Sequence, residues 1–306
     1  MPCAGVAKFN NAVSSLVVSL ATTWSKAMGI DVPIVNAPMG GAAGARLAAA
    51  VSEAGGLGMV GMGSSATPEQ LRRELADLAK PSRPFGIGLV HWVMTERPDL
   101  FDIALEARPA LLSVSFGDDW AWVRRAHDVG VTVATQVATV GDALRAAEAG
   151  VDVLVARGAE AGGHGRPALG TLPLLTQVLD AVELPVLAAG GVASPRGLAA
   201  VLAAGAAAAW LGTVFTTCVE ASTPAAARDR LLAANGENTM LTSEFDIRAG
   251  YRWPADVPER VLTDENGAAT PVNAGQGVGM VNQSLTVAET MSRLCWGAEA
   301  LLRRWS

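Results

Sequence analysis

The feature that most constrains the fold of this chain is a rhythm of short apolar runs. Each run is followed by a loop and then by an alanine-rich segment, and four of these segments stop at a glycine, as helices commonly do. The runs are continuous rather than alternating, which is typical of parallel strands covered by helices. The eight runs are 34–37, 57–60, 85–90, 111–116, 131–137, 151–156, 185–189 and 208–215.

The alternation of runs and helical segments predicts an α/β fold. Eight strands with seven intervening helices, over about 250 residues, match a (β/α)8 TIM barrel better than an open doubly wound sheet. Two stretches, 142–157 and 196–212, support a repeat because both read as helix, glycine and strand. The expected helices are 44–54, 68–79, 98–107, 119–129, 141–149, 172–182 and 195–204, with an eighth at 223–234.

The two ends of the chain depart from this rhythm and suggest the domain boundaries. Residues 1–21 are expected to form an N-terminal extension, either a helix or a loosely ordered segment. Its apolar stretch, 12–21, is far shorter than the ~20 residues that cross a bilayer, and no convincing signal cleavage site follows it. Residues 22–234 form the expected barrel. Residues 235–306 form a small cap on it, with a final helix near 291–305.

Composition excludes several classes of protein. Half of the residues are hydrophobic, so the chain can bury a large core. The net charge is −6 and no basic stripe with interleaved aromatic residues is present, which excludes nucleic acid as a partner. Cys3, Cys218 and Cys295 have no metal-ligand spacing, so neither a metal site nor a disulfide framework is expected. A reducing cytoplasm, with no membrane attachment, fits this pattern.

Loops that follow strands carry the candidate site, because barrel enzymes work at the carboxyl ends of their strands. The loop after the first run contains Ala37, Pro38, Met39 and Gly40. Its proline and glycines predict a turn that presents backbone amides and a methionine at the barrel mouth. On composition alone, a plain glycine-rich turn explains the loop as well.

The loop after the sixth run places His164, one of only three histidines, among four glycines. Gly158, Gly162, Gly163 and Gly165 would let the backbone approach a ligand closely. A lone loop histidine is more often a solvated bystander, but a position at the barrel mouth favours catalysis. Imidazole titrates near neutral pH and can accept a proton there.

A third feature is a pair of glycine turns after the last two runs. In barrels these two loops often form a phosphate site, because unobstructed backbone amides bind a dianion. Gly190, Gly191, Gly212 and Thr213 are the candidates. The alternative is that Gly190-Gly191 simply turns the chain into the next helix.

Three further residues are weaker candidates. His91 ends the third run and fits a functional or a structural role equally well. His127 lies in a predicted helix and is expected to be structural. Gln136, near the end of the fifth run, is a weak candidate for contact with a cofactor ring.

Five motifs, in order and at barrel spacing, resemble the nitronate monooxygenase family, formerly called 2-nitropropane dioxygenases. Members of that family are FMN-containing (β/α)8 barrels, and the resemblance runs from about residue 22 to beyond residue 260. The motifs are APMG (37–40), EAGGLGMVG (53–61), GAEAGGHG (158–165), PVLAAGGV (185–192) and AAWLGTVF (208–215).

The resemblance implies a role for each group of residues. His164 matches the family's catalytic base, which deprotonates a carbon acid near the flavin N5, and Met39 matches a residue that lies against the flavin ring. FMN is the implied cofactor, a nitronate or nitroalkane the substrate and O2 the oxidant. Further FMN contacts are expected at Ala37, Pro38, Gly40, Gly88, Gln136, Arg157, Gly162, Gly163 and Gly190, with the phosphate at Gly191, Trp210, Leu211, Gly212 and Thr213.

Two positions depart from the family pattern. Many members carry glutamine and asparagine where this chain has Arg157 and Gly88. Arg157 is expected to reach the N1–C2 carbonyl edge of the flavin, where its charge would stabilise a reduced, anionic ring. Gly88 leaves a hydrogen bond unmade or given to water. Both departures concern the choice of substrate rather than the cofactor.

Three alternatives share parts of this pattern. An FMN-dependent enoyl-thioester reductase would use NAD(P)H and an acyl carrier protein or CoA thioester on the same fold. A sugar-phosphate lyase or isomerase fits the phosphate loops, but the three lysines (Lys8, Lys26 and Lys80) lie away from the mouth. A flavin-binding protein without turnover is the third alternative. A homodimer is left open.

Overall fold

Eight parallel strands form the centre of the computed structural model, which describes residues 20–78 and 82–304. The strands neighbour one another in the order β1-β9-β8-β6-β5-β4-β3-β2, and a bridge between Val35 and Leu57 joins the two end strands. The predicted (β/α)8 barrel is therefore confirmed. The strands are β1 (Ile34–Asn36), β2 (Gly58–Gly61), β3 (Phe85–Val90), β4 (Leu111–Ser115), β5 (Val133–Val137), β6 (Val153–Arg157), β8 (Val186–Ala189) and β9 (Ala208–Leu211).

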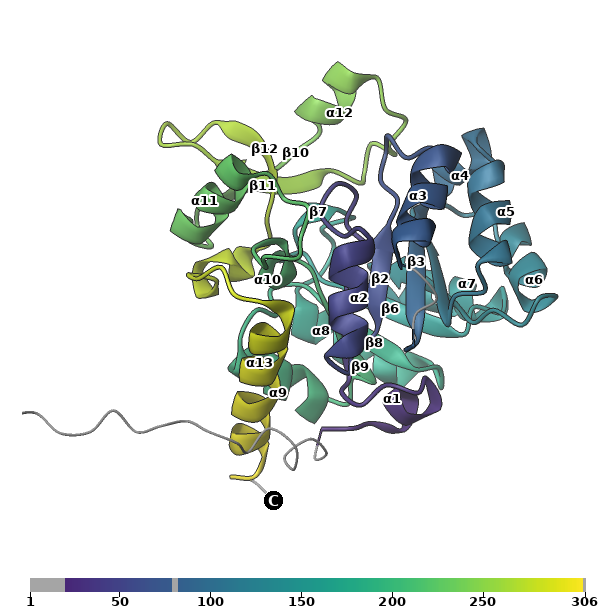
Figure 1. Ribbon diagram of the computed structural model, residues 1–306, viewed down its shortest axis with the longest axis horizontal. Coiled ribbons are helices and arrows are strands. Elements are labelled where there is room, and N and C mark those ends of the chain that lie inside the picture. Colours follow the sequence, from purple (N-terminus) through teal and green to yellow (C-terminus); the bar gives the residue numbers. More distant parts are fainter. Residues whose placement is uncertain (1–19, 79–81, 305–306) are drawn as a thin grey trace, which may run out of the picture.

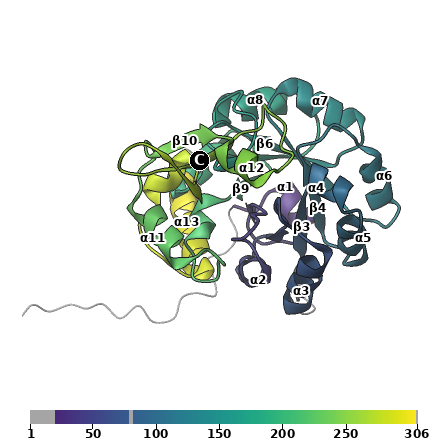
Figure 2. The ribbon, with the colours of Figure 1, turned by 90° about the horizontal axis from the view of Figure 1, so that it is seen from above.

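Helices surround the strands, as Figure 2 shows from above. All seven helices predicted between the strands are present, and α4 adds a helix that the sequence patterns did not predict. The helices of this outer layer are α2 (Ala45–Glu53), α3 (Pro68–Leu78), α4 (His91–Glu96), α5 (Asp99–Glu106), α6 (Ala121–His127), α7 (Val140–Glu148), α8 (Thr171–Ala181), α9 (Pro195–Ala203) and α13 (Val287–Leu302).

The C-terminal helix α13 takes the eighth place in this outer layer. It packs along α9 (Figure 1) and also contacts α2. A Cβ on Gly297 would lie 2.7 Å from the Cβ of Pro195, so glycine permits this close approach. The helix predicted at 223–234 exists as α11 (Ala225–Ala233), but it buries only Leu231 and lies against the cap segment instead.

The barrel has two cores, which explains the continuous apolar runs. An outer core lies between the strands and helices, and a smaller inner core fills the barrel with side chains such as Met59, Val155 and Leu187. The short helix α1 (Thr23–Ala27) adds buried Trp24 to the inner core and closes the lower end. Burial on both faces explains why apolar residues dominate these strands. The stretch predicted as an extension lies mainly outside the described residues.

One predicted strand is too long. The run 208–215 continues past β9, which ends at Leu211, and residues Thr213–Thr216 form the short helix α10. Hydrophobic periodicity cannot separate a buried strand from a buried helical turn, because both are apolar throughout. Thr213 therefore begins a helix at the barrel mouth rather than continuing a strand.

The segment after α11 forms a cap with a small antiparallel sheet, which was not predicted. Strand β11 is central: it pairs with β10 and β12 on one path and also with β7, which carries His164. Figure 1 shows this sheet and helix α12 above the barrel mouth. The cap elements are β10 (Thr239–Thr242), α12 (Glu244–Ala249), β11 (Glu259–Thr263), β12 (Ala269–Asn273) and the 3-10 helix η1 (Gln276–Met280), and β7 (Gly163–His164) joins the sheet from the loop after β6.

Candidate active site

A cavity of about 700 Å³ lies between the barrel mouth and the cap. The loops after β1, β6, β8 and β9 contribute to its walls, as expected for a barrel enzyme. Most of the residues predicted for the site line this one cavity. They are Ala37, Pro38, Met39, Gly40, Gln136, Arg157, Gly162, Gly163, His164, Gly190, Gly191, Trp210, Gly212 and Thr213.

Two predicted cofactor contacts, Gly88 and Leu211, do not line the cavity. A Cβ on Gly88 would lie 2.2 Å from Cγ of Pro38, so the proline ring fills the space that a side chain at position 88 would need. The Leu211 side chain is buried in the outer core, and its carbonyl accepts a hydrogen bond from the Ala37 amide at 2.7 Å. Both residues support the first loop from behind.

The turn after β8 has a backbone that requires glycine. Gly190 and Gly191 have φ angles of 121° and 65°, which side-chain-bearing residues rarely adopt. A Cβ on Gly190 would lie 2.5 Å from the Thr171 hydroxyl, which donates to the Gly190 carbonyl at 3.0 Å. Opposite this turn, the Thr213 hydroxyl accepts from the Gly275 amide at 3.0 Å. These contacts fix two segments whose residues line the cavity. Glycine turns of this kind can present backbone amides to an anion.

His164 is held by the cap on three sides. Its strand β7 pairs with β11, where Glu259 lies opposite it in register. Its Nε2 lies 2.8 Å from Oδ2 of Asp246, and its ring stacks on Trp253 with centroids 3.6 Å apart and planes 4° apart. Burial lowers the pKa of His164 to about 4, against the opposing charge of Glu259. The imidazole is therefore uncharged at neutral pH and able to accept a proton.

Two buried carboxyl groups accompany this imidazole. Asp246 comes from α12, and burial raises its pKa to about 6. Glu259 comes from β11, and burial raises its pKa while a 2.6 Å hydrogen bond from the Asn273 amide opposes that shift. Polar atoms of His164, Asp246 and Glu259 all lie within 4.8 Å of one another. These three residues are called the acid–base cluster below.

Arg157 supports the loop that carries His164. The guanidinium is buried, and its Nη2 donates to the carbonyls of Ala161, Gly162 and Gly163 at 3.3, 3.1 and 2.8 Å. Burial lowers its pKa to about 10, so it stays charged at neutral pH. Gly165 is required beside it, because a Cβ there would lie 2.1 Å from Nη1 of Arg157.

Aromatic side chains form the wall behind His164. Trp253 anchors this wall, since its Nε1 donates to the Ser64 hydroxyl at 3.0 Å and its ring packs edge-on against Phe116 at 5.0 Å. Phe116 has a left-handed backbone with φ of 71°, a strained conformation that often occurs at functional sites. Trp92 and Tyr251 extend the wall.

The other two histidines lie outside the site. His91 is the first residue of α4 and lines neither described cavity. His127 lies on α6, where its Nε2 is 3.0 Å from Oδ2 of Asp152, so its predicted structural role agrees with this position.

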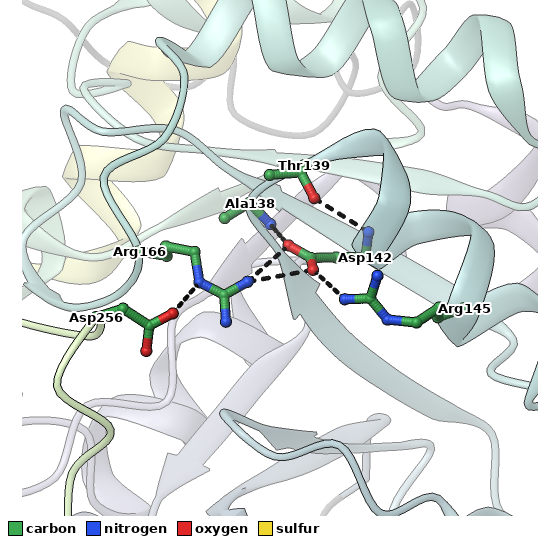
Figure 3. A network of polar contacts seen from close by, with 6 residues as sticks. All are labelled: Ala138, Thr139, Asp142, Arg145, Arg166 and Asp256. Carbon is green, nitrogen blue, oxygen red and sulfur yellow. Dashed lines mark hydrogen bonds and ion pairs between the residues drawn. The ribbon is translucent and has the colours of Figure 1, made fainter.

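Ion pairs connect the cap loop to the barrel at one edge of the site. Arg166 donates from Nε to Asp256 at 2.6 Å and from Nη1 to both oxygens of Asp142 at 3.2 Å (Figure 3). Arg145 binds the same Asp142 carboxylate at 2.5 Å. Exposed pairs of this kind contribute about 0–1 kcal/mol each. They also border a second cavity of about 240 Å³, which shares Phe116, Gln136 and Arg157 with the larger one.

Sequence patterns missed the cap's contribution to the site. Asp246, Trp253 and Glu259 are far from His164 in sequence and follow no known spacing. One signal was present, because Asn266-Gly267 is a strong hairpin turn signal between β11 and β12. That hairpin would have placed Glu259 in a sheet, but not beside His164.

Two solved structures resemble this chain over most of its length. The solved nitroalkane oxidase of Streptomyces ansochromogenes has a TM-score of 0.79 and 28% identity, covering 92% of this chain and 100% of that chain. FabK of Thermotoga maritima has a TM-score of 0.83 and 27% identity, covering 94% and 99%. No helix among the described residues is long and apolar enough to cross a membrane.

Sequence relatives identify the family. A nitronate monooxygenase of Pseudomonas aeruginosa is 32% identical over 296 residues, covering 81% of this chain and 83% of the relative. The family model described as nitronate monooxygenase matches residues 21–104 and 92–252. This is a family of flavoenzymes. The chain belongs to the nitronate monooxygenase family and is an oxidoreductase.

Proposed function

We propose that this protein is an FMN-dependent oxidoreductase that oxidises nitronates, or related carbon acids, with O2. The proposal rests mainly on one observation: the glycine turn after β8, the start of α10 and His164 all line the same cavity. A phosphate site and a base on one cavity are what a flavin enzyme acting on a carbon acid requires.

The cavity fits FMN in size and in chemistry. Its volume of about 700 Å³ lies within the range of about 300–1,000 Å³ for cofactor sites. The enclosed Thr223 hydroxyl, which contributes to the lining, has no hydrogen-bond partner among the described residues. Amides at Gly190, Gly191, Gly212 and Thr213 would hold the phosphate. Bound FMN supplies the electron-accepting chemistry.

His164 would act on the substrate. Its uncharged imidazole takes a proton from the carbon next to the nitro group of a neutral nitroalkane, and the resulting nitronate is ready for oxidation. The aromatic wall and the cap would shield this step from bulk water. A nitronate supplied as such needs no base, so the two substrate forms separate the role of His164 from that of the cofactor.

The first test concerns the cofactor. Purified protein is expected to be yellow and to release FMN on denaturation, as measured by chromatography against FMN, FAD and riboflavin standards. Protein stripped of flavin should regain the colour when FMN is added. A colourless protein that does not take up FMN would refute the proposal.

The second test separates the leading function from the enoyl-thioester reductase. We expect oxygen uptake with propionate 3-nitronate and no substrate-dependent oxidation of NAD(P)H with an enoyl-CoA. The barrel itself does not distinguish the two activities, because both use the same fold. The reverse result would assign the protein to the reductase class.

Replacing Arg157 by glutamine should lower the midpoint potential of the bound flavin. A buried positive charge on the cavity wall stabilises added electrons, so its loss should shift the potential negative by an amount on the order of tens of millivolts. Arg260→Gln is the matched control, because Arg260 is also buried and donates to a carbonyl of the same loop, that of Ala159 at 3.0 Å, but does not line the cavity. Redox titration of both variants measures the midpoint potential. Equal shifts in the two variants would contradict a specific effect of Arg157.

Location, assembly and domain boundaries remain predictions. We propose a cytoplasmic location, which cell fractionation tests. Formation of a homodimer is left open, and light scattering measures the oligomeric state. The proposed division into 1–21, 22–234 and 235–306 is tested by limited proteolysis. The placement of α13 against α9 and α2 predicts that the last segment does not separate from the barrel in that experiment.

A further inference from the structure

We propose that Asp246 is the positioning residue of His164: its carboxylate accepts the Nε2 proton and leaves Nδ1 of the imidazole as the base. This inference rests on the proposed function. It concerns a residue that lies 82 positions away from His164 in the sequence and belongs to the cap rather than to the barrel.

The position of Asp246 on α12 is the first observation. This short helix protrudes from the cap (Figure 1), and Asp246 is its one buried residue. Its neighbour Ile247 is 77% exposed, so the helix faces the site with a carboxylate and solvent with an apolar side chain. This arrangement is the opposite of what packing alone would select. A buried carboxylate needs a partner, and the hydrogen-bond partner of its side chain among the described residues is His164.

The geometry of the imidazole is the second observation. Nε2 lies 2.8 Å from Oδ2 of Asp246, while stacking on Trp253 sets the plane of the ring. A neutral imidazole carries one N–H, and an ionised carboxylate can only accept. The proton therefore belongs on Nε2. Nδ1 has no hydrogen-bond partner among the described residues, and His164 lines the cavity, so we assign Nδ1 to the substrate.

Other charged groups near His164 are occupied elsewhere. Glu259, from β11, accepts a hydrogen bond from the amide of Asn273 at 2.6 Å. Arg157, from β6, donates to three loop carbonyls. Neither makes a hydrogen bond to the imidazole. Of the two carboxyl groups in the acid–base cluster, Asp246 is the one placed to choose the tautomer.

The tautomer itself is the first test. The chain has three histidines, so the ring nitrogens of the ¹⁵N-histidine-labelled holoenzyme can be resolved by NMR and assigned with His164→Gln. We expect the Nε2–H tautomer of His164 in the wild type. In Asp246→Asn the new amide can donate to Nε2, so the proton should move largely to Nδ1. The same tautomer in both proteins would overturn the inference.

Kinetics with two substrate forms is the second test. Asp246→Asn should lower kcat/KM for neutral nitroethane by about 100-fold or more, because the base is in the wrong tautomer. Oxidation of its preformed nitronate should change little, and Asp246→Glu should recover part of the loss. Glu244→Gln is the matched control, since Glu244 is an exposed acid on the same helix and pairs with Arg248.

The outcomes separate this inference from the proposed function. Equal losses on nitroethane and its nitronate would mean that Asp246 is only structural, and would overturn the inference. Wild-type turnover of the nitronate alone would also overturn it while leaving the proposed function intact. Wild-type turnover of neither substrate would refute the proposed function, and the NMR result would still decide whether Asp246 sets the tautomer.

Discussion

Replacing His164 by glutamine is expected to lower kcat/KM for nitroethane by about 10³-fold while FMN stays bound. A positioned general base contributes about 10²–10⁴-fold, and the glutamine amide cannot accept a carbon-bound proton at neutral pH. Glutamine resembles histidine in reach, so the cavity and the contact with Asp246 can persist. Oxygen uptake with nitroethane, compared at equal flavin content, measures the effect.

The same variant should oxidise preformed nitronate at nearly the wild-type rate, because that substrate has already lost its proton. His127→Gln provides the matched control. His127 also pairs with an aspartate, Asp152, but on the outside of the barrel. Unchanged activity of His164→Gln on nitroethane would refute the base assignment, and loss of both activities would show that His164 acts on the cofactor or on folding instead.

Replacing Gly190 by alanine should weaken FMN binding by about 10²-fold or more. A Cβ there would lie 2.5 Å from the Thr171 hydroxyl, and φ of 121° is strained for any side-chain-bearing residue. The turn must move to relieve this contact, which takes its amides away from the phosphate. Loss of two hydrogen bonds to a charged group, at about 1.5–3 kcal/mol each, accounts for the size of the effect. Fluorescence titration of stripped protein with FMN measures it.

Gly130→Ala is the matched control for that experiment. Gly130 also has a positive φ, 76°, but a Cβ there would meet nothing within 4 Å, and the residue lies in the turn between α6 and β5. It should lose about 1 kcal/mol of stability and retain its FMN affinity. Equal FMN affinity in the two variants would contradict a phosphate site at Gly190.

The barrel was predictable because its signal is local and repeated. Each strand is buried on both faces, so the apolar runs mark it directly, and the glycines that end the helices mark the turns. The end of β9 was missed because buried apolar residues, Val214 and Phe215, continue past Leu211. The place of α13 was missed because α11 comes before it in the chain after the barrel strands. Of these two helices, only α13 buries a row of side chains, and it packs against α9 and α2.

The candidate site was predictable only in part, and for the same reason: local patterns could be predicted and contacts between distant segments could not. His164 and the glycines at 190 and 191 stand in loops after strands, and topology brings all such loops to one end of a barrel, so their common cavity follows from sequence order. Arg157 was predicted to face a flavin edge, and it lines the cavity. Its bonds to three loop carbonyls could not be foreseen, because they depend on the path of a glycine-rich loop.

By itself, the sequence determined the eightfold repeat, the loops that carry the site and the histidine among glycines, since each depends on residues close together in the chain. Only the tertiary structure decided what surrounds that histidine. Asp246, Trp253 and Glu259 reach it because β7 pairs with β11 and the cap folds back over the mouth. Such contacts join distant segments through side-chain packing and strand register. Neither of these produces a periodic hydrophobic pattern in the sequence.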